Sequence, residues 1–544
     1  MSKVVDVETA VGMIKDGDTV VVDGITFGCP EELCCAVEDS YLKKGKPANI
    51  VLFGPGGTGN TRGLGFDHFA HEGLMKTYVG SYLNLTRKLD EFIRDEKAEG
   101  YLIPLGVSCH LLREISAGRP GIFKKIGLKT YIDPRIEGGR LNSISRGEDY
   151  VPEIISLHGE EYLFFKSFKI DVALIRGTTA DEDGNITLEK EAGIMNGLEM
   201  AMAAKKCGGI VIAQVERIAA RGTLKPMNVR IPGILVDFIV IASPKNHMQT
   251  WREQYNPAIS GEIKLPISNA PLVPFDLKKV VARRAVLELR PGAVVNLGAG
   301  MSEFVSSVSW EEGINENITF VIEAGMIGGV PGFGLNFNTA VNATCILSQS
   351  SILDYLDGGG HDFSFLGFAQ FDKQGNVNVS KVLGRIPGIG GFHNVAPTAK
   401  QRFHCGAFTA GKSDIRVEDG RLRIVKDGNV IKFVDRVDQI SASGEYALDI
   451  GQPTTIITER CVFEWTREGL VLTEIAPGVN IEENILKKMQ FKPIISRNLK
   501  EMPADIFKKP LLNLKNKYPW NQTDNSVVLN LEHSFAEGGE KMPT

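Results

Sequence analysis

Short apolar runs rich in β-branched residues alternate along the chain with segments of helical periodicity, and glycine-rich turns follow several of the runs. Residues 318–322 fit a buried strand, 293–295 fit a second strand, and 278–289 have the spacing of a helix. Strands that alternate with helices are typical of an open, mostly parallel sheet covered by helices. The pattern therefore predicts an α/β fold.

The pattern also recurs within the chain. Three pairs of similar segments occur in the same order: 16–22 with 290–295, 49–53 with 317–321, and 181–186 with 372–377. One such match could arise by chance, but three in one order indicate a divergent duplication. We therefore expect two similar domains, each an open and mostly parallel sheet, that face each other.

Proline content and the loss of periodicity set the predicted domain boundaries. A chain of 544 residues exceeds what one core supports. Residues 253–275 hold several prolines and little periodicity, so they are predicted to link an amino-terminal domain, 1–252, to a second domain, 276–510. From 511 to 544 Asn, Lys, Glu and Gly become more frequent, and a polar tail is expected.

Composition excludes several classes of function. The chain is 43% hydrophobic and 23% charged, which is ordinary for a globular protein, and its net charge of −5 offers no basic field for nucleic acid. No apolar run is long enough for a membrane span, and the first residues resemble neither a signal peptide nor a transit peptide. The eight cysteines lack paired spacing. We expect a cytoplasmic protein without metal, membrane or nucleic-acid partner.

Glu323 is the strongest candidate for chemistry. It follows the strand predicted at 318–322, and Gly325, Gly328 and Gly329 come directly after it. A carboxylate at the carboxyl end of a buried strand is poorly placed for solvation, and glycines allow a ligand or another backbone to approach. A surface ion pair or a turn cap is the plainer alternative for a Glu after a strand. The sequence favours Glu323 as a nucleophile.

Further glycine turns surround this segment in the sequence, at 296–301, 358–362 and 385–392. The first follows the strand at 293–295, where bare amides could hold a phosphate or a carbonyl oxygen. Glycine in such numbers weakens a fold unless the backbone must come close to something. Close packing of helix on sheet is the alternative for any single glycine.

Several separate segments resemble the class I CoA-transferases, and within them the fused-chain acetate/propionate CoA-transferase type. The resemblance runs from about residue 5 to about residue 507 and rests on these segments: 68–74, 131–135, 161–163, 296–300, 323–329 (Glu-Ala-Gly-Met-Ile-Gly-Gly), 357–360, 403–411, 457–463 and 474–479. It implies a ping-pong enzyme whose substrates are a short-chain acyl-CoA and a small carboxylate. It implies no cofactor besides CoA as substrate.

The resemblance also assigns residues. Glu323 would form a covalent glutamyl-CoA thioester, and its reference pKa of about 4.3 means that it needs no general base at neutral pH. The oxyanion and the CoA arm would be held by two glycine turns: Gly298, Ala299, Gly300 and Met301 in one, and Gly388, Gly390 and Gly391 in the other. The family is commonly oligomeric, so a homo-oligomer is expected, with a tetramer as one form.

The amino-terminal loop departs from the family pattern. Thr26, Phe27 and Gly28 stand where relatives place a glycine-rich turn, so these residues are a candidate carboxylate pocket with an uncertain acyl preference. A CoA-transferase dedicated to a ketoacid or dicarboxylate stays open, as does a non-catalytic CoA-binding relative. A Rossmann-type dehydrogenase is disfavoured because its glycine fingerprint is incomplete.

Two histidines, His68 and His71, raise one further alternative. They lie three residues apart with an acidic residue beside each, which could indicate a metal site on a helix. No third ligand is evident nearby in the sequence. Packing or surface histidines are therefore the favoured interpretation, and no metal is predicted.

Overall fold

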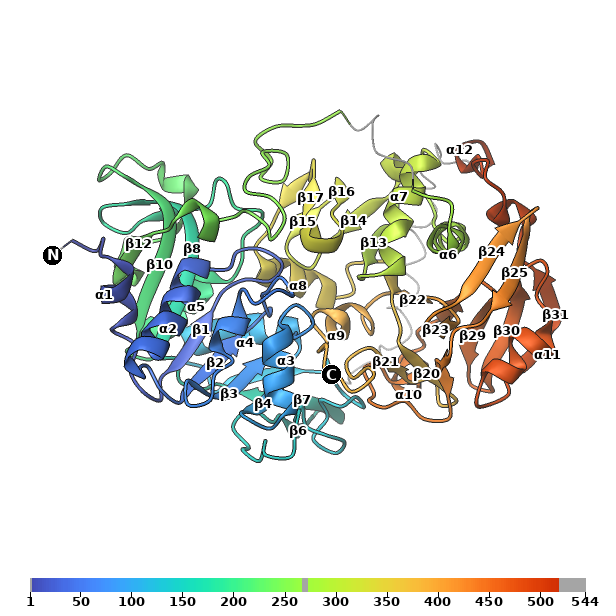
Figure 1. Ribbon diagram of the computed structural model, residues 1–544, viewed down its shortest axis with the longest axis horizontal. Helices are drawn as coiled ribbons and strands as arrows, with labels where there is room; N and C mark the ends of the chain where they lie inside the picture. The colour runs from blue at the N-terminus through green and yellow to red at the C-terminus, as the bar shows by residue number, and fades with distance from the viewer. Residues whose placement is uncertain (1, 267–272, 518–544) are drawn as a thin grey trace, which may run out of the picture.

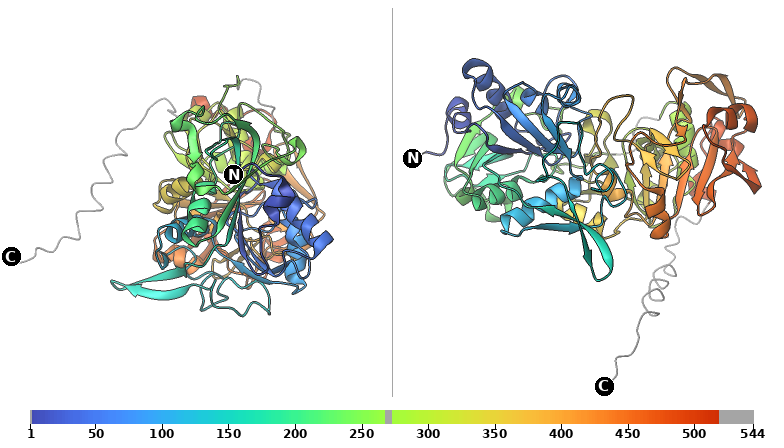
Figure 2. Two further views of the ribbon diagram at one scale, coloured as in Figure 1. Left: turned by 90° about the vertical axis from the view of Figure 1, so that its left-hand side faces the viewer. Right: turned by 90° about the horizontal axis from the view of Figure 1, so that it is seen from below.

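The computed structural model describes residues 2–266 and 273–517 (Figure 1). Each half of the chain forms its own mostly parallel sheet with helices packed on it, and the halves lie side by side along the long axis (Figures 1 and 2). The α/β class predicted from the hydrophobic pattern is confirmed. Among the described residues, no helix combines the length and apolar character needed to cross a bilayer.

The first sheet has a parallel core in the order β12, β10, β8, β1, β2, β3, β4. Its strands are β1 Thr19–Val22, β2 Ile50–Gly54, β3 Met75–Gly80, β4 Glu99–Leu102, β8 Val172–Asp181, β10 Ile210–Ala219 and β12 Phe238–Ile241. Two short antiparallel strands, β9 Ile186–Thr187 and β11 Val229–Ile231, extend it beside β8. The central strand β8 is buried at every position, as expected for a strand covered on both faces.

Helices and one small sheet complete the first half. The helices are α1 Val7–Val11, α2 Glu31–Lys44, α3 Arg87–Arg94, α4 Leu105–Ser116 and α5 Gly197–Lys206. The small antiparallel sheet consists of β5 Gly121–Lys124, β6 Glu153–Leu157 and β7 Glu160–Lys166. In Figure 2 this sheet projects from the body of the molecule.

The second sheet begins with a parallel part in the order β14, β13, β19, β22, β28. These strands are β13 Val294–Leu297, β14 Thr319–Val321, β19 Phe363–Leu366, β22 Gln401–Cys405 and β28 Thr454–Ile457. Antiparallel strands β29 Cys461–Thr466 and β30 Gly469–Ile475 continue it to β31 Ile494–Glu501. The helices are α6 Leu277–Val286, α7 Phe304–Glu311, α8 Gln349–Asp357, α9 Phe392–Val395 and α10 Gly444–Asp449.

The helix expected at 278–289 is α6. Asp276 begins it, because its carboxylate accepts hydrogen bonds from the backbone N–H groups of Lys278 at 2.9 Å and Lys279 at 3.1 Å. The strand expected next is β13, which starts and ends slightly later than the apolar run suggested.

The predicted duplication has a counterpart in strand order. The order β2, β1, β8, β10, β12 in the first half corresponds to β14, β13, β19, β22, β28 in the second. The matched turns agree in detail as well. Asp181 accepts backbone hydrogen bonds from Asp183 and Asn185, and Asp372 accepts the equivalent pair from Gln374 and Asn376. Each aspartate therefore fixes the same tight turn, Asp181 at the end of β8 and Asp372 at the end of β20, Gln370–Asp372.

Two apolar clusters join the halves. The junction cluster contains Ile25 and Phe27 from the first half with Ile322, Ala324 and Met326 from the second. A second cluster forms where α4 meets α8, and it also includes residues from β14 and α9. The end of β14 is therefore held between the two halves by hydrophobic contact.

The predicted tail begins later than its composition suggested. Leu512 and Leu514 are buried against the core of the second half, and the Leu512 N–H donates to Glu312 at 2.8 Å. Residues 518–544 lie outside the described residues, as do 267–272 of the predicted linker. Within the described part of that linker, Lys264 Nζ donates to the carbonyl of Ala343 at 2.7 Å.

Candidate active site

Glu323 lies two residues beyond β14, at the carboxyl end of the strand, as the sequence predicted. A tight turn places it there, because the Ile322 N–H donates to Met326 O and the Gly325 N–H donates to Ile322 O, both at 2.9 Å. Gly325 adopts φ +111°, and a Cβ at this position would overlap with the carbonyl of Leu347. Only glycine fits this turn without strain.

The carboxyl group of Glu323 is buried. The residue is 9% exposed, and burial raises its pKa from 4.5 to about 7. From its reference pKa, this group was expected to be ionised at neutral pH. In the unliganded protein the buried group is instead near its midpoint at pH 7, because desolvation disfavours the charged form.

Gly391 borders the carboxyl group directly. A Cβ placed on Gly391 would overlap with Oε2 of Glu323. The backbone of Gly391 has an ordinary φ of −80°, so the absence of a side chain is required by space and not by conformation. The predicted close approach of a glycine turn to Glu323 is therefore present in the structure.

Residues 387–391 are fixed to the first half by backbone hydrogen bonds. The N–H groups of Ile389 and Gly390 both donate to Ser81 O at 2.9 Å, and the Leu83 N–H donates to Pro387 O at 2.8 Å. The amide of Gly390 is thus committed to Ser81 and cannot serve an oxyanion, which corrects the expectation for this residue. Among the described residues, the N–H groups of Gly388 and Gly391 have no acceptor.

The turn at 296–301 reaches the site only in part. Gly298 and Ala299 line the same cavity as Glu323, whereas Gly300 and Met301 do not line it. Gly298 donates its N–H to Phe365 O at 2.8 Å, and Gly300 donates to the carboxylate of Glu303 at 2.7 Å. Both glycine amides are therefore occupied, and the contribution of this turn is mainly to shape the wall.

The cavity at Glu323 has a volume of about 710 Å³ and receives residues from both halves. Apolar side chains make up much of its wall: Ile25, Leu105, Leu335, Phe337, Leu366, Val379, Val382, Leu383, Ile389 and Phe392. A largely apolar pocket with a few placed polar groups is typical of small-molecule sites.

Residues from the first half that sequence reasoning missed also line this cavity. Gly56 and Gly57 follow β2, and Tyr82 and Asn84 follow β3. Burial raises the pKa of Tyr82, and negative charge on Glu323 raises it further, so the phenol stays protonated and can donate. The duplication contained a signal for these two glycines. In the match of 49–53 with 317–321, residue 55 is the position equivalent to Glu323, and Gly56 and Gly57 come directly after it.

The candidate carboxylate pocket is only partly confirmed in position. Thr26 lines the cavity, and its hydroxyl donates to the carbonyl of Phe337. Phe27 instead packs in the junction cluster. Gly28 lines a neighbouring cavity of about 430 Å³. Phe27 and Gly28 therefore do not reach the cavity of Glu323, because the loop turns away after Thr26.

Cys405 has no access to this cavity. It lies on β22, is 1% exposed, and burial raises the pKa of its thiol.

The glycine turn at 357–360 has a structural contact of its own. Asp357 accepts a hydrogen bond from Asn394 at 2.7 Å, and Asn394 accepts one from the Gly106 N–H at 2.9 Å. This chain of contacts ties α8 and α9 to α4.

The sequence matches known families along most of its length. A family model described as Coenzyme A transferase matches residues 4–242. The chain is 43% identical over 514 residues to the caffeate CoA-transferase of Acetobacterium woodii, covering 93% of this chain and 98% of that protein. It is 38% identical over 506 residues to the acetate CoA-transferase YdiF of Escherichia coli, covering 93% of this chain and 95% of that protein.

Solved structures are also similar to this chain over most of its length. The acyl-CoA transferase (YdiF) apoenzyme of Escherichia coli has a TM-score of 0.89 at 36% identity, covering 94% of this chain and 97% of that chain. A second structure of that protein, described as a thioester complex with CoA, gives the same TM-score, identity and coverage. Both similarities span the two halves of the chain.

Proposed function

The chain belongs to the coenzyme A transferase family, and from that premise we propose that it moves CoA from a short-chain acyl-CoA to a free carboxylate through a thioester on Glu323. One observation carries the proposal. The carboxyl of Glu323, two residues beyond β14, lines the 710 Å³ cavity and meets the bare backbone of Gly391. The description of the related Escherichia coli structure as a thioester complex with CoA supports it.

The reaction follows from the chemistry of a carboxylate nucleophile. The Glu323 carboxylate attacks the donor thioester carbonyl, which releases CoA thiolate and leaves a mixed anhydride. The thiolate then attacks the Glu323 carbonyl, so that the donor acid leaves and a glutamyl-CoA thioester remains. The acceptor carboxylate attacks this thioester to form a second anhydride and CoA thiolate. Attack of the thiolate on the acceptor carbonyl yields the new acyl-CoA and frees Glu323.

Each step passes through an oxyanion, and the free amides near Glu323 are its proposed donors. Gly388 and Gly391 have N–H groups without acceptors in the described part of the chain. Loss of one oxyanion donor costs about 2.7–4 kcal/mol in other acyl-transfer enzymes. The protonated phenol of Tyr82 is a further donor on the cavity wall.

A second candidate substrate class is a larger, aromatic acyl group. The cavity wall is mostly apolar, and a relative that is 43% identical is named a caffeate CoA-transferase. A dedicated ketoacid or dicarboxylate enzyme would need a cation on the wall to match a second polar group. Among the residues that the structure describes, Arg385 is the cation that lines the cavity, and its Nε is paired with Asp90 at 3.2 Å. A non-catalytic CoA-binding relative would leave Glu323 unlabelled.

Covalent labelling tests the central step. Acetyl-CoA or propionyl-CoA without an acceptor should leave CoA attached to the protein, and peptide mapping should place it on Glu323. Glu323→Gln should bind CoA but neither label nor turn over, because a neutral amide is not a competent nucleophile. Cys405→Ser is the matched control and should label normally. An adduct on a cysteine, or no adduct at all, contradicts the proposal.

An acceptor panel then separates the substrate classes. The labelled protein would be offered acetate, butyrate, lactate, acetoacetate, succinate and caffeate, and the new acyl-CoA measured for each. Faster discharge by acetate and butyrate supports the short-chain proposal. Faster discharge by caffeate supports the aromatic alternative, and acetoacetate or succinate supports the dedicated enzyme.

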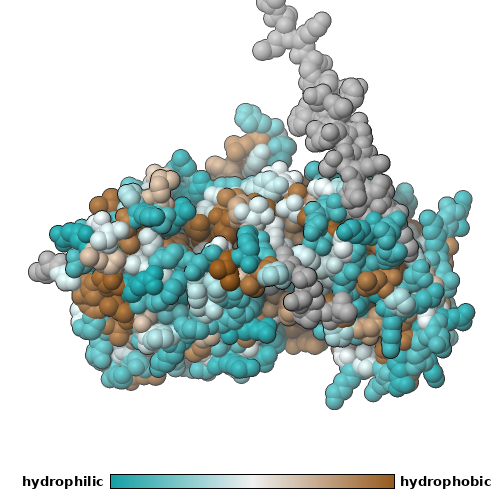
Figure 3. All heavy atoms as spheres, turned by 90° about the horizontal axis from the view of Figure 1, so that it is seen from above, coloured by the Kyte–Doolittle hydropathy of each residue, from teal (hydrophilic) through white to brown (hydrophobic). Residues whose placement is uncertain are grey.

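We also propose that the protein is a homo-oligomer. Apolar (brown) atoms gather at one end of the face shown in Figure 3, among largely polar (teal) surface. In the isolated chain Met227 and Ile234 are 86% and 87% exposed, and a subunit interface that included them would remove this apolar surface from water. Light scattering that shows a monomer would contradict this proposal.

The cytoplasmic location stays a prediction from the sequence.

A further inference from the structure

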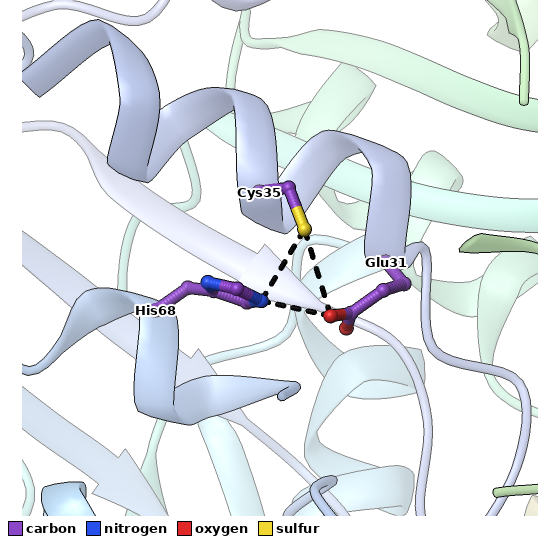
Figure 4. Close-up of side chains that lie close together, drawn as sticks. All are labelled: Glu31, Cys35 and His68. Atoms are coloured by element: carbon purple, nitrogen blue, oxygen red, sulfur yellow. Dashed lines mark hydrogen bonds and ion pairs between the residues drawn. The ribbon is translucent and has the colours of Figure 1, made fainter. Parts of the chain in front are cut away.

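Helix α2 and the short helix η1, Phe66–Phe69, bring three potential metal ligands together away from the cavity of Glu323. Glu31 and Cys35 are four residues apart on α2, so they lie one above the other on the same face. His68 on η1 points at them from across the gap, as Figure 4 shows. Glu31 is 3% exposed and His68 7% exposed.

The distances among the three ligand atoms approach those of a tetrahedral metal site. Cys35 Sγ lies 3.3 Å from His68 Nε2 and 3.6 Å from Glu31 Oε1, and the last two atoms are 2.7 Å apart. Zinc bonds of about 2.3 Å to sulfur and about 2.0–2.2 Å to nitrogen or oxygen put tetrahedral ligand atoms roughly 3.3–3.6 Å apart. Two distances thus fit, and the third needs to open by about 0.6 Å.

Surrounding groups already orient these ligands. The Nδ1 atom of His68 is hydrogen-bonded to Glu38, which leaves Nε2 directed at Glu31 and Cys35. Glu38 is held in turn by His71 Nε2 at 2.6 Å. The other oxygen of Glu31 accepts the Gly65 N–H at 3.0 Å. A carboxylate behind a ligating histidine is the usual outer support of a zinc site.

We propose that Glu31, Cys35 and His68 bind a divalent metal ion of the zinc type. Thiolate, imidazole and carboxylate together suit zinc better than magnesium or calcium, which prefer oxygen ligands. Cys35 is partly exposed, which gives the ion a path to the site and leaves a fourth position for water. No third ligand was evident beside His68 and His71 in the sequence, because Glu31 and Cys35 lie more than thirty residues earlier, on α2.

The proposed role is to fasten the segment after β2. Gly65, which donates to Glu31, also borders Thr58 closely, and the chain just before Thr58 lines the Glu323 cavity. A metal bridge between α2 and η1 would hold this segment to the sheet. No step of CoA transfer passes through it.

Metal content is the first test. The purified full-length protein would be stripped with a chelator, supplied with zinc, freed of excess metal and analysed by mass spectrometry of the elements. We expect about one zinc per chain in the wild type and in Cys207→Ser, a cysteine of similar exposure that is not one of the three ligands. We expect none in Cys35→Ala, which leaves the Glu31–His68 ion pair in place. Glu38→Gln should weaken binding by about 10- to 100-fold.

Two further measurements separate a metal site from a plain ion-pair cluster. Calorimetric titration with zinc should show binding of about one ion per chain, and cobalt in place of zinc should give a thiolate charge-transfer band that Cys35→Ala abolishes. Zinc should also raise the melting temperature of the wild type and not of Cys35→Ala. Absence of stoichiometric zinc in the wild type, or full binding by Cys35→Ala, would overturn the proposal.

Discussion

At the scale of single residues, Glu323 combines two demands that oppose each other. A nucleophile must be ionised, yet burial raises the pKa of this carboxyl to about 7. The fraction of carboxylate therefore rises with pH across the neutral range. We expect the rate of labelling by acyl-CoA to increase about tenfold per pH unit below 6 and to level off above about 8. Single-turnover labelling between pH 5 and 9 measures this, and a flat profile would mean that binding of acyl-CoA restores an ordinary pKa.

The same pKa has a consequence for stability. The pKa of Glu323 in the folded state lies above its unfolded value of 4.5. The contribution of this carboxyl group to the free energy of unfolding is therefore fully present below about pH 4.5 and is lost as pH rises through 7. Glu323→Gln removes this titration. At pH 8 the variant should be more stable than the wild type by up to roughly 3 kcal/mol, with a gap that closes toward pH 5. Urea unfolding at both pH values measures the gap, and a gap independent of pH would contradict burial as its cause.

Sequence reasoning identified Glu323 because the apolar run and the following glycine are local signals. It could not identify Tyr82, whose place on the cavity wall depends on pairing between the two halves. Nor could it show that the Gly390 amide is committed to Ser81, because that contact joins residues about three hundred positions apart. The pKa of Glu323 likewise depends on burial, which the local sequence does not report.

At the scale of elements, the turn at 387–391 contains two glycines that are required for different reasons, one for lack of space and one for its backbone conformation. Gly391 has an ordinary backbone, but a Cβ there would overlap with Glu323. Gly390 has φ +54°, and a Cβ there would find its nearest neighbour, Tyr82, at 3.6 Å. Gly391→Ala should therefore reduce turnover at least tenfold with little loss of stability. Gly390→Ala should cost about 1–2 kcal/mol of stability and affect turnover less.

Turnover and thermal unfolding measured on both variants test this reasoning. If Gly391→Ala loses stability and turnover together, the glycine serves packing instead of the nucleophile. If Gly390→Ala loses more turnover than Gly391→Ala, the turn must move when substrate binds.

Element boundaries were predictable where a cap or a proline marks them, and less so elsewhere. Asp276 before α6 gave a clear start, and hydrogen bonds to Lys278 and Lys279 explain why. The end of the second domain was placed too early, because the polar composition after 510 hides Leu512 and Leu514, whose burial against the core is tertiary.

At the scale of the whole molecule, we expect the two halves to unfold as one cooperative unit, because two apolar clusters join them. Leu353 on α8 is fully buried in the cluster that joins α8 to α4. Leu353→Ala should cost about 2–5 kcal/mol and shift a single calorimetric transition to lower temperature. Hydrogen exchange should become faster in β1 of the first half as well as in β14. A change confined to the second half would show that the halves unfold independently.

The duplication was visible in the sequence, and the strand order of both sheets agrees with it. How the halves meet was not visible, because α4 and the loop at Thr26 are first-half features without a marked pattern of their own. The extension through the antiparallel strands β29 and β30 to β31 also breaks the repeat, since the described part of the first half has no equivalent after β12.

Because residues of both halves line the cavity, the peptide connection between the halves keeps the two parts of the site together. The nucleophile comes from one half and Gly56, Gly57 and Tyr82 from the other, so neither half alone encloses the reacting atoms. A covalent connection makes the encounter of the two halves intramolecular, so it does not depend on protein concentration. If the chain were cut within 253–275, turnover at high dilution would become second order in the two fragments. The intact chain keeps its specific activity at any dilution, which is what covalent fusion gives a site assembled from two pieces.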